Sequence, residues 1–171
     1  MIIGLNKSWG YSHLNFSTYH LSAGITEGKR DSATGKFLKP VALNDTTESY
    51  EISGSNDFTN YSPSVPLQEI RHNKISLSSS FVAGKGVIKS ILGFQQNLRQ
   101  EYTNILTPDD YGLFFHLVTL NYDFRYLFPE INNWNISIGI NGMLQRNQNK
   151  GKEFLIPAYQ LLDAGGFVFL K

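Results

Sequence analysis

The stretch from His72 to Tyr102, HNKISLSSSFVAGKGVIKSILGFQQNLRQEY, decides the fold of this chain. Apolar and polar residues alternate along both of its halves, which are joined at Ala83-Gly84-Lys85-Gly86. A period of two is typical of a strand with one apolar face, because a helix needs apolar residues three and four positions apart. The glycines supply the positive φ of a tight reversal. The stretch therefore predicts an amphipathic hairpin with strands longer than the usual length of about five or six residues.

The same alternation recurs along the chain and predicts an all-β protein. Further strands are expected at residues 3–5, 14–18, 114–126, 134–147 and 159–170, although the pattern does not fix which face of the last strand is apolar. Short connections at residues 9–10, 83–86 and 129–133 alternate with longer ones. This spacing predicts an antiparallel up-and-down meander of about seven long strands, with the short turns at one end and the longer loops at the other.

A long connection is expected from about residue 22 to residue 69, where Gly, Ser, Thr, Asn, Asp and Pro replace the alternation. A connection of this length without regular structure is normally either functional or disordered. Two interpretations stay open, namely a loop that folds over a ligand and a mobile surface segment. The side chains available for ligand contact are Lys29, Arg30, Lys36, Lys39, Tyr50, Phe58 and Tyr61.

The composition restricts the class of protein. Hydrophobic residues make up 41% of the chain, and charged residues make up 17%, below the value of roughly 25% in soluble domains. The net charge of +1 argues against nucleic acid as a partner, and the absence of Cys excludes disulfides and thiolate metal sites. No run approaches the length of a transmembrane helix, but a transmembrane strand needs only about 9–11 residues.

Alternation alone does not decide whether the apolar face points into a soluble barrel or out towards lipid. Aromatic residues gather beside the short turns, the loops are longer at the opposite end, and the polar face is rich in Ser, Asn and Gln, all of which favour an outer-membrane barrel. Because single-chain bacterial barrels have an even strand count, seven strands predict a segment of a larger barrel, from a truncated product or a gene fragment. The aromatic residues are Trp9, Tyr11, Phe81, Tyr126, Phe128 and Trp134.

Four segments carry a family resemblance: GLNKSWGYSHLNFS at 4–17, LGFQQNLRQEY at 92–102, IGINGMLQRNQNKG at 138–151 and EFLIPAY at 153–159. Together they resemble the barrel of TonB-dependent outer-membrane receptors, of the siderophore-receptor type found in Bacteroidetes. The resemblance implies that residues 1–171 form part of a 22-stranded barrel with a plugged lumen in the Gram-negative outer membrane. The plug domain and the TonB-contacting box have no counterpart in the chain.

As the resemblance implies, the function is active uptake of a ferric siderophore or similar iron chelate, driven through TonB and the plug, with no catalytic residues and no cofactor. The expected partners are outer-membrane lipid, TonB and the small-molecule ligand. Six polar residues are expected to face the lumen, where they would hydrogen-bond an oxygen-rich chelate, with Arg99 as a fixed charge. The alternative is that they hydrate the lumen or contact the plug. They are Gln95, Asn97, Arg99, Asn141, Gln145 and Asn147.

Other chemistry has weaker support in the sequence. The four histidines lack paired ligand spacing, Gly84-Lys85-Gly86 precedes a strand rather than a helix, and Asp109-Asp110 is typical of a turn. The run from Ser78 to Ser80 lacks the context of a serine nucleophile. The alternatives that stay open are uptake of a glycan, cobalamin or haem, a small outer-membrane enzyme or adhesin, and a soluble β-sandwich binding module.

Overall fold

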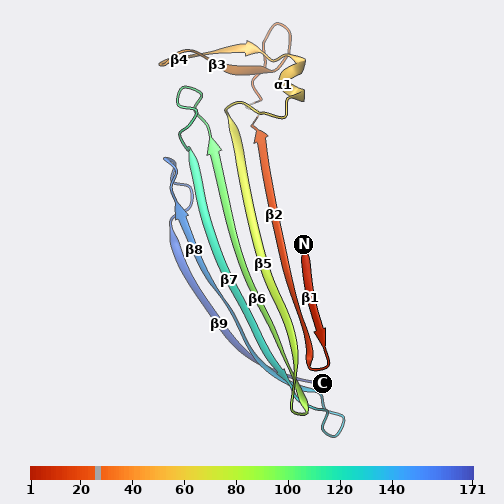
Figure 1. Ribbon diagram of the computed structural model, residues 1–171. Helices are drawn as coiled ribbons and strands as arrows, with labels where there is room; N and C mark the ends of the chain where they lie inside the picture. The colour runs from red at the N-terminus through yellow and green to blue at the C-terminus, as the bar shows by residue number, and fades with distance from the viewer. Residues whose placement is uncertain (26–27) are drawn as a thin grey trace.

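The computed structural model describes residues 1–25 and 28–171, and its main feature is one antiparallel sheet of seven strands (Figure 1). The strand order β1-β2-β5-β6-β7-β8-β9 follows the chain as a meander. The predicted all-β class and the seven-stranded meander are therefore confirmed. The strands are β1 (Ile2–Lys7), β2 (Gly10–Gly24), β5 (Leu67–Ala83), β6 (Gly86–Tyr102), β7 (Leu113–Leu127), β8 (Ile136–Asn149) and β9 (Tyr159–Leu170).

The central hairpin of β5 and β6 has the longest continuous pairing in the sheet. Its register runs without a shift from the pair Leu67 and Tyr102 to the pair Ala83 and Gly86. Each strand has 17 residues, about three times the usual length. Gly84 has a φ of 62°, and glycine at the first central position is typical of a two-residue type II′ turn. The hairpin predicted from this stretch is present.

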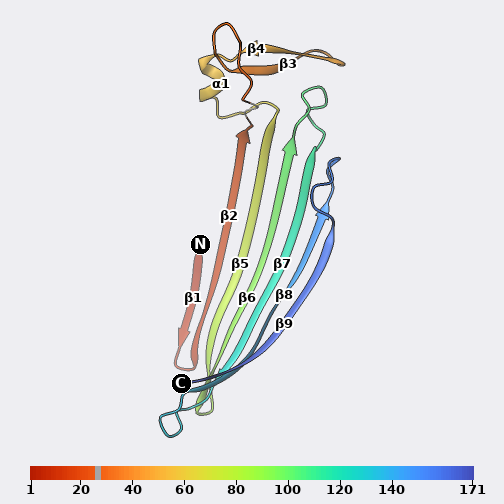
Figure 2. The same ribbon diagram turned by 180° about the vertical axis from the view of Figure 1, so that it is seen from behind.

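The short connections lie together at one end of the sheet, and the longer connections lie at the other end (Figures 1 and 2). Residues 8–9, 84–85 and 128–135 form the first set, and residues 25–66, 103–112 and 150–158 form the second.

Two predicted boundaries were wrong. The first turn consists of residues 8–9 rather than 9–10, because Lys7 pairs with Gly10. The third connection is longer than expected, because Asn132 and Asn133 form a left-handed turn that joins Ile131 to Trp134 before β8 begins.

The long connection was predicted to be structureless over about residues 22–69, and this prediction was wrong in extent and in content. Residues 22–24 pair with residues 67–69, so the loop spans 25–66. Backbone pairing needs no apolar alternation, which is why the sequence pattern ended early. The loop contains a hairpin of β3 (Leu38–Asn44) and β4 (Thr47–Ile52), followed by the short helix α1 (Ser55–Thr59), beyond the loop end of the sheet (Figure 1). Asn44 Oδ1 accepts hydrogen bonds from Thr46 N and Thr46 Oγ1, both at 3.0 Å, which fixes the hairpin turn.

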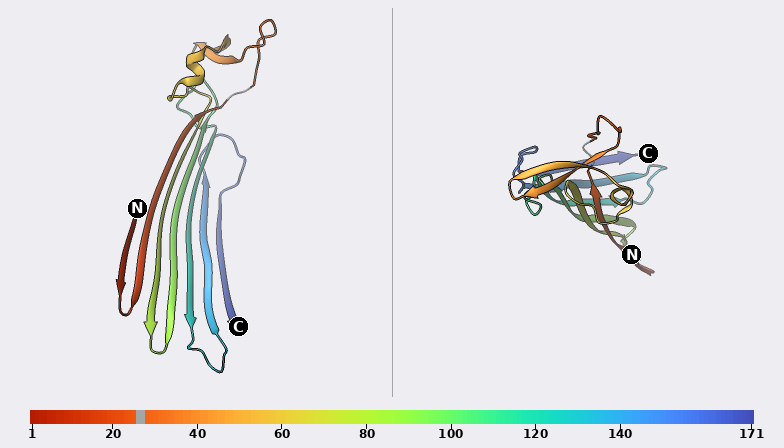
Figure 3. Two further views of the ribbon diagram at one scale, coloured as in Figure 1. Left: turned by 90° about the vertical axis from the view of Figure 1, so that its right-hand side faces the viewer. Right: turned by 90° about the horizontal axis from the view of Figure 1, so that it is seen from above.

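The seven strands form a single curved layer (Figure 3). Among the described residues, Leu113 and Phe115 are the only buried hydrophobic side chains, and Ile140 on the sheet is 55% exposed. The chain therefore has no core between two layers. In the described part of the chain, no helix is long and apolar enough to cross a membrane.

The register brings apolar residues from all strands onto one face, here called the apolar face, and polar residues onto the other, the polar face. Four cross-strand rows nearest the short turns form what we call the apolar band. The structure also assigns the faces of β9, since Leu162 pairs with Leu144 and Val168 pairs with Ile138. The main members of the band are Leu14, Phe16, Ile75, Leu77, Phe81, Ile88, Leu92, Phe94, Leu120, Tyr122, Phe124, Tyr126, Ile138, Ile140, Leu144, Leu162 and Val168.

Replacing Gly86 with alanine should weaken the pairing of β6 with β7. A Cβ at Gly86 would lie 2.5 Å from the Leu127 carbonyl oxygen and would also collide with the Tyr126 hydroxyl, so the backbone of β7 must move. We expect the free energy of unfolding to fall by about 1–3 kcal/mol, which denaturant titration in detergent micelles would measure. Gly93→Ala in the same strand is the matched control, because its Cβ would meet only Asn121 Cβ at 3.8 Å. An equal loss in both variants would contradict the prediction.

Candidate functional site

The polar face is the candidate functional site, and it carries all six residues predicted from the sequence. Gln95 and Gln145 lie in one cross-strand row with Thr119 between them. Asn97 and Asn147 share the next row towards the loops, and Arg99 follows one row further. Neighbouring strands are about 4.8 Å apart, so residues two strands apart in a row are about 10 Å apart. Five of the six residues therefore gather near the loop end of the sheet.

The Gln145 amide is held on both sides by neighbouring side chains. Its Nε2 donates to Thr119 Oγ1 at 3.0 Å, and its Oε1 accepts a hydrogen bond from the Tyr159 hydroxyl at 2.7 Å. Thr119 has no exposed surface, so its hydroxyl is bonded without access to water. The sequence analysis did not single out Thr119 or Tyr159. Only the pairing of β7, β8 and β9 brings these three residues together.

The two asparagines also have protein partners. Asn97 Nδ2 lies 3.2 Å from His72 Nδ1 on β5 and donates to it in the histidine tautomer that leaves this ring nitrogen without a proton. Asn147 is 5% exposed, and its Nδ2 donates to the Pro157 carbonyl oxygen at 3.4 Å. Asn147 therefore supports the loop between β8 and β9. Among the six predicted residues, it offers the least surface to a ligand.

Arg99 does not present an uncompensated charge. Its Nη2 and Nε both approach Glu101 Oε1, at 2.6 and 3.2 Å, and Gln68 Nε2 donates to the same oxygen at 2.6 Å. The Arg99 side chain is 49% exposed, so it is accessible to a ligand, but an anionic ligand would compete with Glu101. The expectation of a fixed positive charge omitted this carboxylate. Its signal in the sequence was the spacing of two residues, which places Arg99 and Glu101 on one face.

Asn141 lies apart from the other five residues, four residues nearer the short turns than Gln145. Its cross-strand partner on β7 is Asp123, which forms a two-point ion pair with Arg125 at 2.9 and 3.0 Å. A small cavity of about 160 Å³ opens beside this pair, with Lys89 and Ser78 among its lining residues. The polar face thus has two separate polar clusters, an amide-rich one near the loops and a charged one nearer the turns.

Among the described residues, histidines and acidic side chains form no metal-binding group. Within residues 1–25 and 28–171, no three His, Asp or Glu side chains come together as ligands. His13 and His72 lie on the polar face, and His20 and His116 lie on the apolar face beyond the band. Asp110, predicted to act in a turn, forms an ion pair with Lys152 that links the two loops 103–112 and 150–158.

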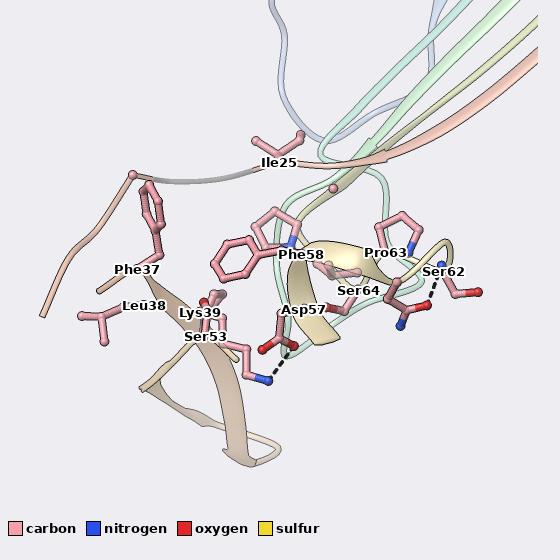
Figure 4. Close-up of a pocket in the computed structure, with 16 residues that line it drawn as sticks. Ile25, Phe37, Leu38, Lys39, Ser53, Asp57, Phe58, Ser62, Pro63 and Ser64 are labelled. Atoms are coloured by element: carbon pink, nitrogen blue, oxygen red, sulfur yellow. Dashed lines mark hydrogen bonds and ion pairs between the residues drawn. The ribbon is translucent and has the colours of Figure 1, made fainter. Parts of the chain in front are cut away.

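The loop between β2 and β5 forms a second cavity, of about 340 Å³ (Figure 4). The rings of Phe37 and Phe58 meet edge to face with their centroids 6.1 Å apart. Lys39 Nζ lies 2.9 Å from Asp57 Oδ1, so the side chains of β3 and α1 are joined by an ion pair at the cavity. The cavity combines aromatic surface with a charged pair that is already neutralised.

The other loop residues considered from the sequence have various roles. Lys29 Nζ lies 3.6 Å from the centre of the Tyr50 ring, and the Arg30 guanidinium lies 3.9 Å from the centre of the Phe37 ring. These cation–π contacts hold the hairpin and its preceding segment together. Tyr61 is fully exposed. Lys36 precedes β3, and its carbonyl oxygen accepts a hydrogen bond from Asp31 N.

Titration of Asp57 should report the ion pair at the loop cavity. The Lys39 ammonium is the main cause that lowers the pKa of Asp57 below its ordinary value of 3.8, with help from the Gly54 N–H. Because the folded-state pKa is lowered, the stabilising effect of this pair is present above the ordinary value and is lost as the pH falls through the folded-state pKa. In Lys39→Gln we expect the pKa of Asp57 to rise towards 3.8, as measured by carboxylate NMR.

Asp31 provides the internal control for this titration. Its pKa is lowered mainly by the Thr34 hydroxyl, which does not involve Lys39, so it should titrate unchanged in Lys39→Gln. A titration of Asp57 that stays the same in the variant would contradict the ion pair. Equal shifts of both carboxylates would indicate that the loop has refolded instead.

Comparisons with known proteins do not assign the chain to a family. No protein-family model, no curated protein and no solved structure matches it. The function proposed below is therefore supported by the arrangement of residues on the sheet, together with the resemblance of the four sequence segments quoted above.

Proposed function

We propose that this chain is a barrel segment of a TonB-dependent outer-membrane receptor of the Gram-negative type, which takes up a ferric siderophore or a similar iron chelate. The apolar band would face lipid, and the polar face would line the lumen. As the resemblance implies, energy would reach a plug domain through TonB. The chain would bind and conduct its ligand without a catalytic step and without a cofactor of its own.

The observation that carries the proposal is the uncovered apolar band on a single-layer sheet. On β7 the apolar residues extend from Leu120 to Tyr126, and Phe128 follows directly after the strand, so the apolar stretch covers roughly nine residues, which matches the length of a membrane-spanning strand. Within the band Ser12 Oγ and Ser79 Oγ share a hydrogen bond at 2.8 Å, so one hydroxyl of the pair donates to the other rather than to water. A face with this composition is stable in lipid, whereas in water it would be a large exposed hydrophobic patch.

Aromatic rings at the turn end of the band support a membrane interface there. Trp9 stacks on Phe81 with ring centroids 5.4 Å apart, and Tyr126 meets Phe128 edge to face at 4.7 Å. Trp134 lies in the neighbouring connection and is 55% exposed. Amphipathic rings of this kind favour the boundary between hydrocarbon and water.

The open edges of the sheet support a larger barrel. With an odd number of strands, β1 and β9 run in the same direction and cannot close the sheet by antiparallel pairing with each other. In hydrocarbon, every unpaired backbone group would cost several kcal/mol. The proposal therefore requires further strands, each antiparallel to its neighbour, beside β1 and β9.

The polar face supports an oxygen-rich ligand rather than an apolar one. Its polar groups are mainly amides, hydroxyls and charged side chains, which bind through hydrogen bonds and tolerate water between protein and ligand. Gln95 and Asn97 on β6 are the best candidates for ligand contact, because both are partly exposed and Gln95 lies in the same row as Lys74. Uptake of a glycan, cobalamin or haem by the same mechanism remains the alternative that an uptake measurement must exclude.

An arginine placed at Leu92 should impair insertion into membranes. Leu92 lies inside the apolar band, where a cation on the lipid face costs roughly 2–4 kcal/mol near the bilayer centre. Entry of a receptor that carries this chain as part of its barrel into phosphatidylcholine vesicles, measured by flotation with the vesicles, should be strong for the natural sequence and weak for Leu92→Arg. Ile91→Arg is the matched control, because Ile91 is the neighbouring residue on the polar face.

Two outcomes would contradict the membrane assignment. The first is a folded, monomeric chain in buffer without detergent, which would favour a soluble binding module. The second is equal entry of the Leu92→Arg and Ile91→Arg variants, which would show that the two faces do not differ towards lipid.

The identity of the transported ligand is tested by measuring uptake through a receptor that carries this chain as part of its barrel. Cells that depend on this receptor should accumulate labelled ferric chelates, and Gln95→Leu together with Asn97→Leu should reduce the uptake by weakening ligand binding. Ser76→Ala on the neighbouring strand β5 should leave it unchanged. Uptake of cobalamin, haem or a glycan without uptake of ferric chelates would overturn the iron assignment.

A further inference from the structure

We propose that the apolar face of β7, β8 and β9 binds one anionic lipid, with its phosphate at Arg146 and Lys150 and an acyl chain in the groove below them. This inference rests on the proposed membrane location. It concerns the face opposite the candidate functional site and is independent of the ligand that the receptor transports.

Arg146 lies where the apolar band ends. Leu120 and Leu144 form the last apolar pair between β7 and β8, and the next pair in the same direction is Val118 with Arg146. Arg146 is therefore two residues beyond Leu144 on the same face. In a bilayer, this step from aliphatic to cationic side chains corresponds to the depth at which lipid headgroups begin.

A groove of about 440 Å³ runs along this part of the face. Leu120, Leu144 and Leu162 line its apolar part, and Arg146 and Gln160 line its end away from the turns. The groove is thus apolar at one end and carries a cation at the other. An acyl chain fits the first part, and a phosphate group fits the second.

Lys150 adds a second cation to the region around His116. Lys150 N donates to the Phe114 carbonyl oxygen at 2.8 Å, and Lys150 Nζ lies 5.5 Å from the centre of the Phe114 ring. Both cations are close enough to His116 to act on its ring electrostatically, and His116 is itself held by Gln96 at 3.0 Å. Lys150 therefore lies on the apolar face, directed to the same region as Arg146.

Neither cation is neutralised by an acidic side chain in the described part of the chain. Among the described residues, Arg146 and Lys150 form no ion pair, whereas Arg71 on the same face approaches Glu69 at 3.5 Å and Lys152 in the adjacent loop pairs with Asp110. Two unpaired cations above an apolar groove complement an amphipathic anion. We therefore assign the site to a lipid with a phosphate headgroup rather than to a free anion, which would leave the groove unfilled.

The test compares a receptor that carries this chain as part of its barrel in two kinds of vesicle, one of phosphatidylcholine alone and one of phosphatidylcholine that contains phosphatidylglycerol. We expect the natural sequence to bind the anionic vesicles more tightly. Arg146→Gln combined with Lys150→Gln should reduce this preference about 30-fold, because each basic residue at a membrane surface contributes about fivefold. Vesicle co-sedimentation measures the preference, and far-UV circular dichroism checks that each variant keeps its strand content.

Two further variants distinguish a binding site formed by Arg146 and Lys150 from a general effect of net positive charge. Lys74→Gln with Lys89→Gln removes the same charge from the polar face and should keep the preference. Arg146→Lys with Lys150→Arg retains both charges and should also keep it. An equal loss in the polar-face variant would overturn the site, because the effect would then depend on net charge alone.

The outcomes also distinguish this inference from the proposed function. Failure of the natural sequence to enter neutral vesicles would overturn both. Entry into neutral vesicles without a preference for phosphatidylglycerol would overturn the lipid site alone. Loss of the preference when inorganic phosphate is added at constant ionic strength would show a free-anion site and would overturn the assignment to a lipid.

Discussion

The backbone register between β5 and β6 is the constraint on which the rest of the structure depends. Pairing without a shift from Leu67 and Tyr102 to the turn fixes which side chains of both strands share a face, and each further strand adds to that register. A slip of one residue would move Lys89 into the apolar band and Arg99 onto the apolar face beyond it. Because the sheet has one layer, no second layer could compensate for such an error. The strand pairing alone therefore separates the apolar face from the polar face.

The candidate site on the polar face is a network that is already bonded within the protein. Thr119 and Tyr159 hold Gln145, and Glu101 holds Arg99. Such bonds orient the amides and the guanidinium before any ligand arrives, which reduces the entropy lost on binding. They also mean that a ligand must replace an internal partner at Arg99. Gln95 and Asn97 are therefore better placed than Arg99 for a first contact.

The apolar face changes its chemistry in a fixed order along the strands. Aromatic rings lie nearest the short turns, aliphatic side chains follow, and Arg146 and Lys150 come next towards the loops. This order matches the layers of a whole bilayer, from one interface through hydrocarbon to the headgroups on the other side. The proposed function and the proposed lipid site both depend on it, but on different parts. The first depends on the aliphatic rows, and the second depends on the cations beyond them.

Residue alternation was enough to predict the strands, the glycine turn at Gly84 and the common face of the six candidate residues, because side-chain direction along a strand is local and has a period of two. Alternation disappears beyond the apolar band, so the ends of β2 and β5 and the hairpin of β3 and β4 were missed. Tertiary structure decided the partners of Gln145, the faces of β9 and the placing of Arg146 and Lys150 around His116, since cross-strand register joins residues distant in sequence.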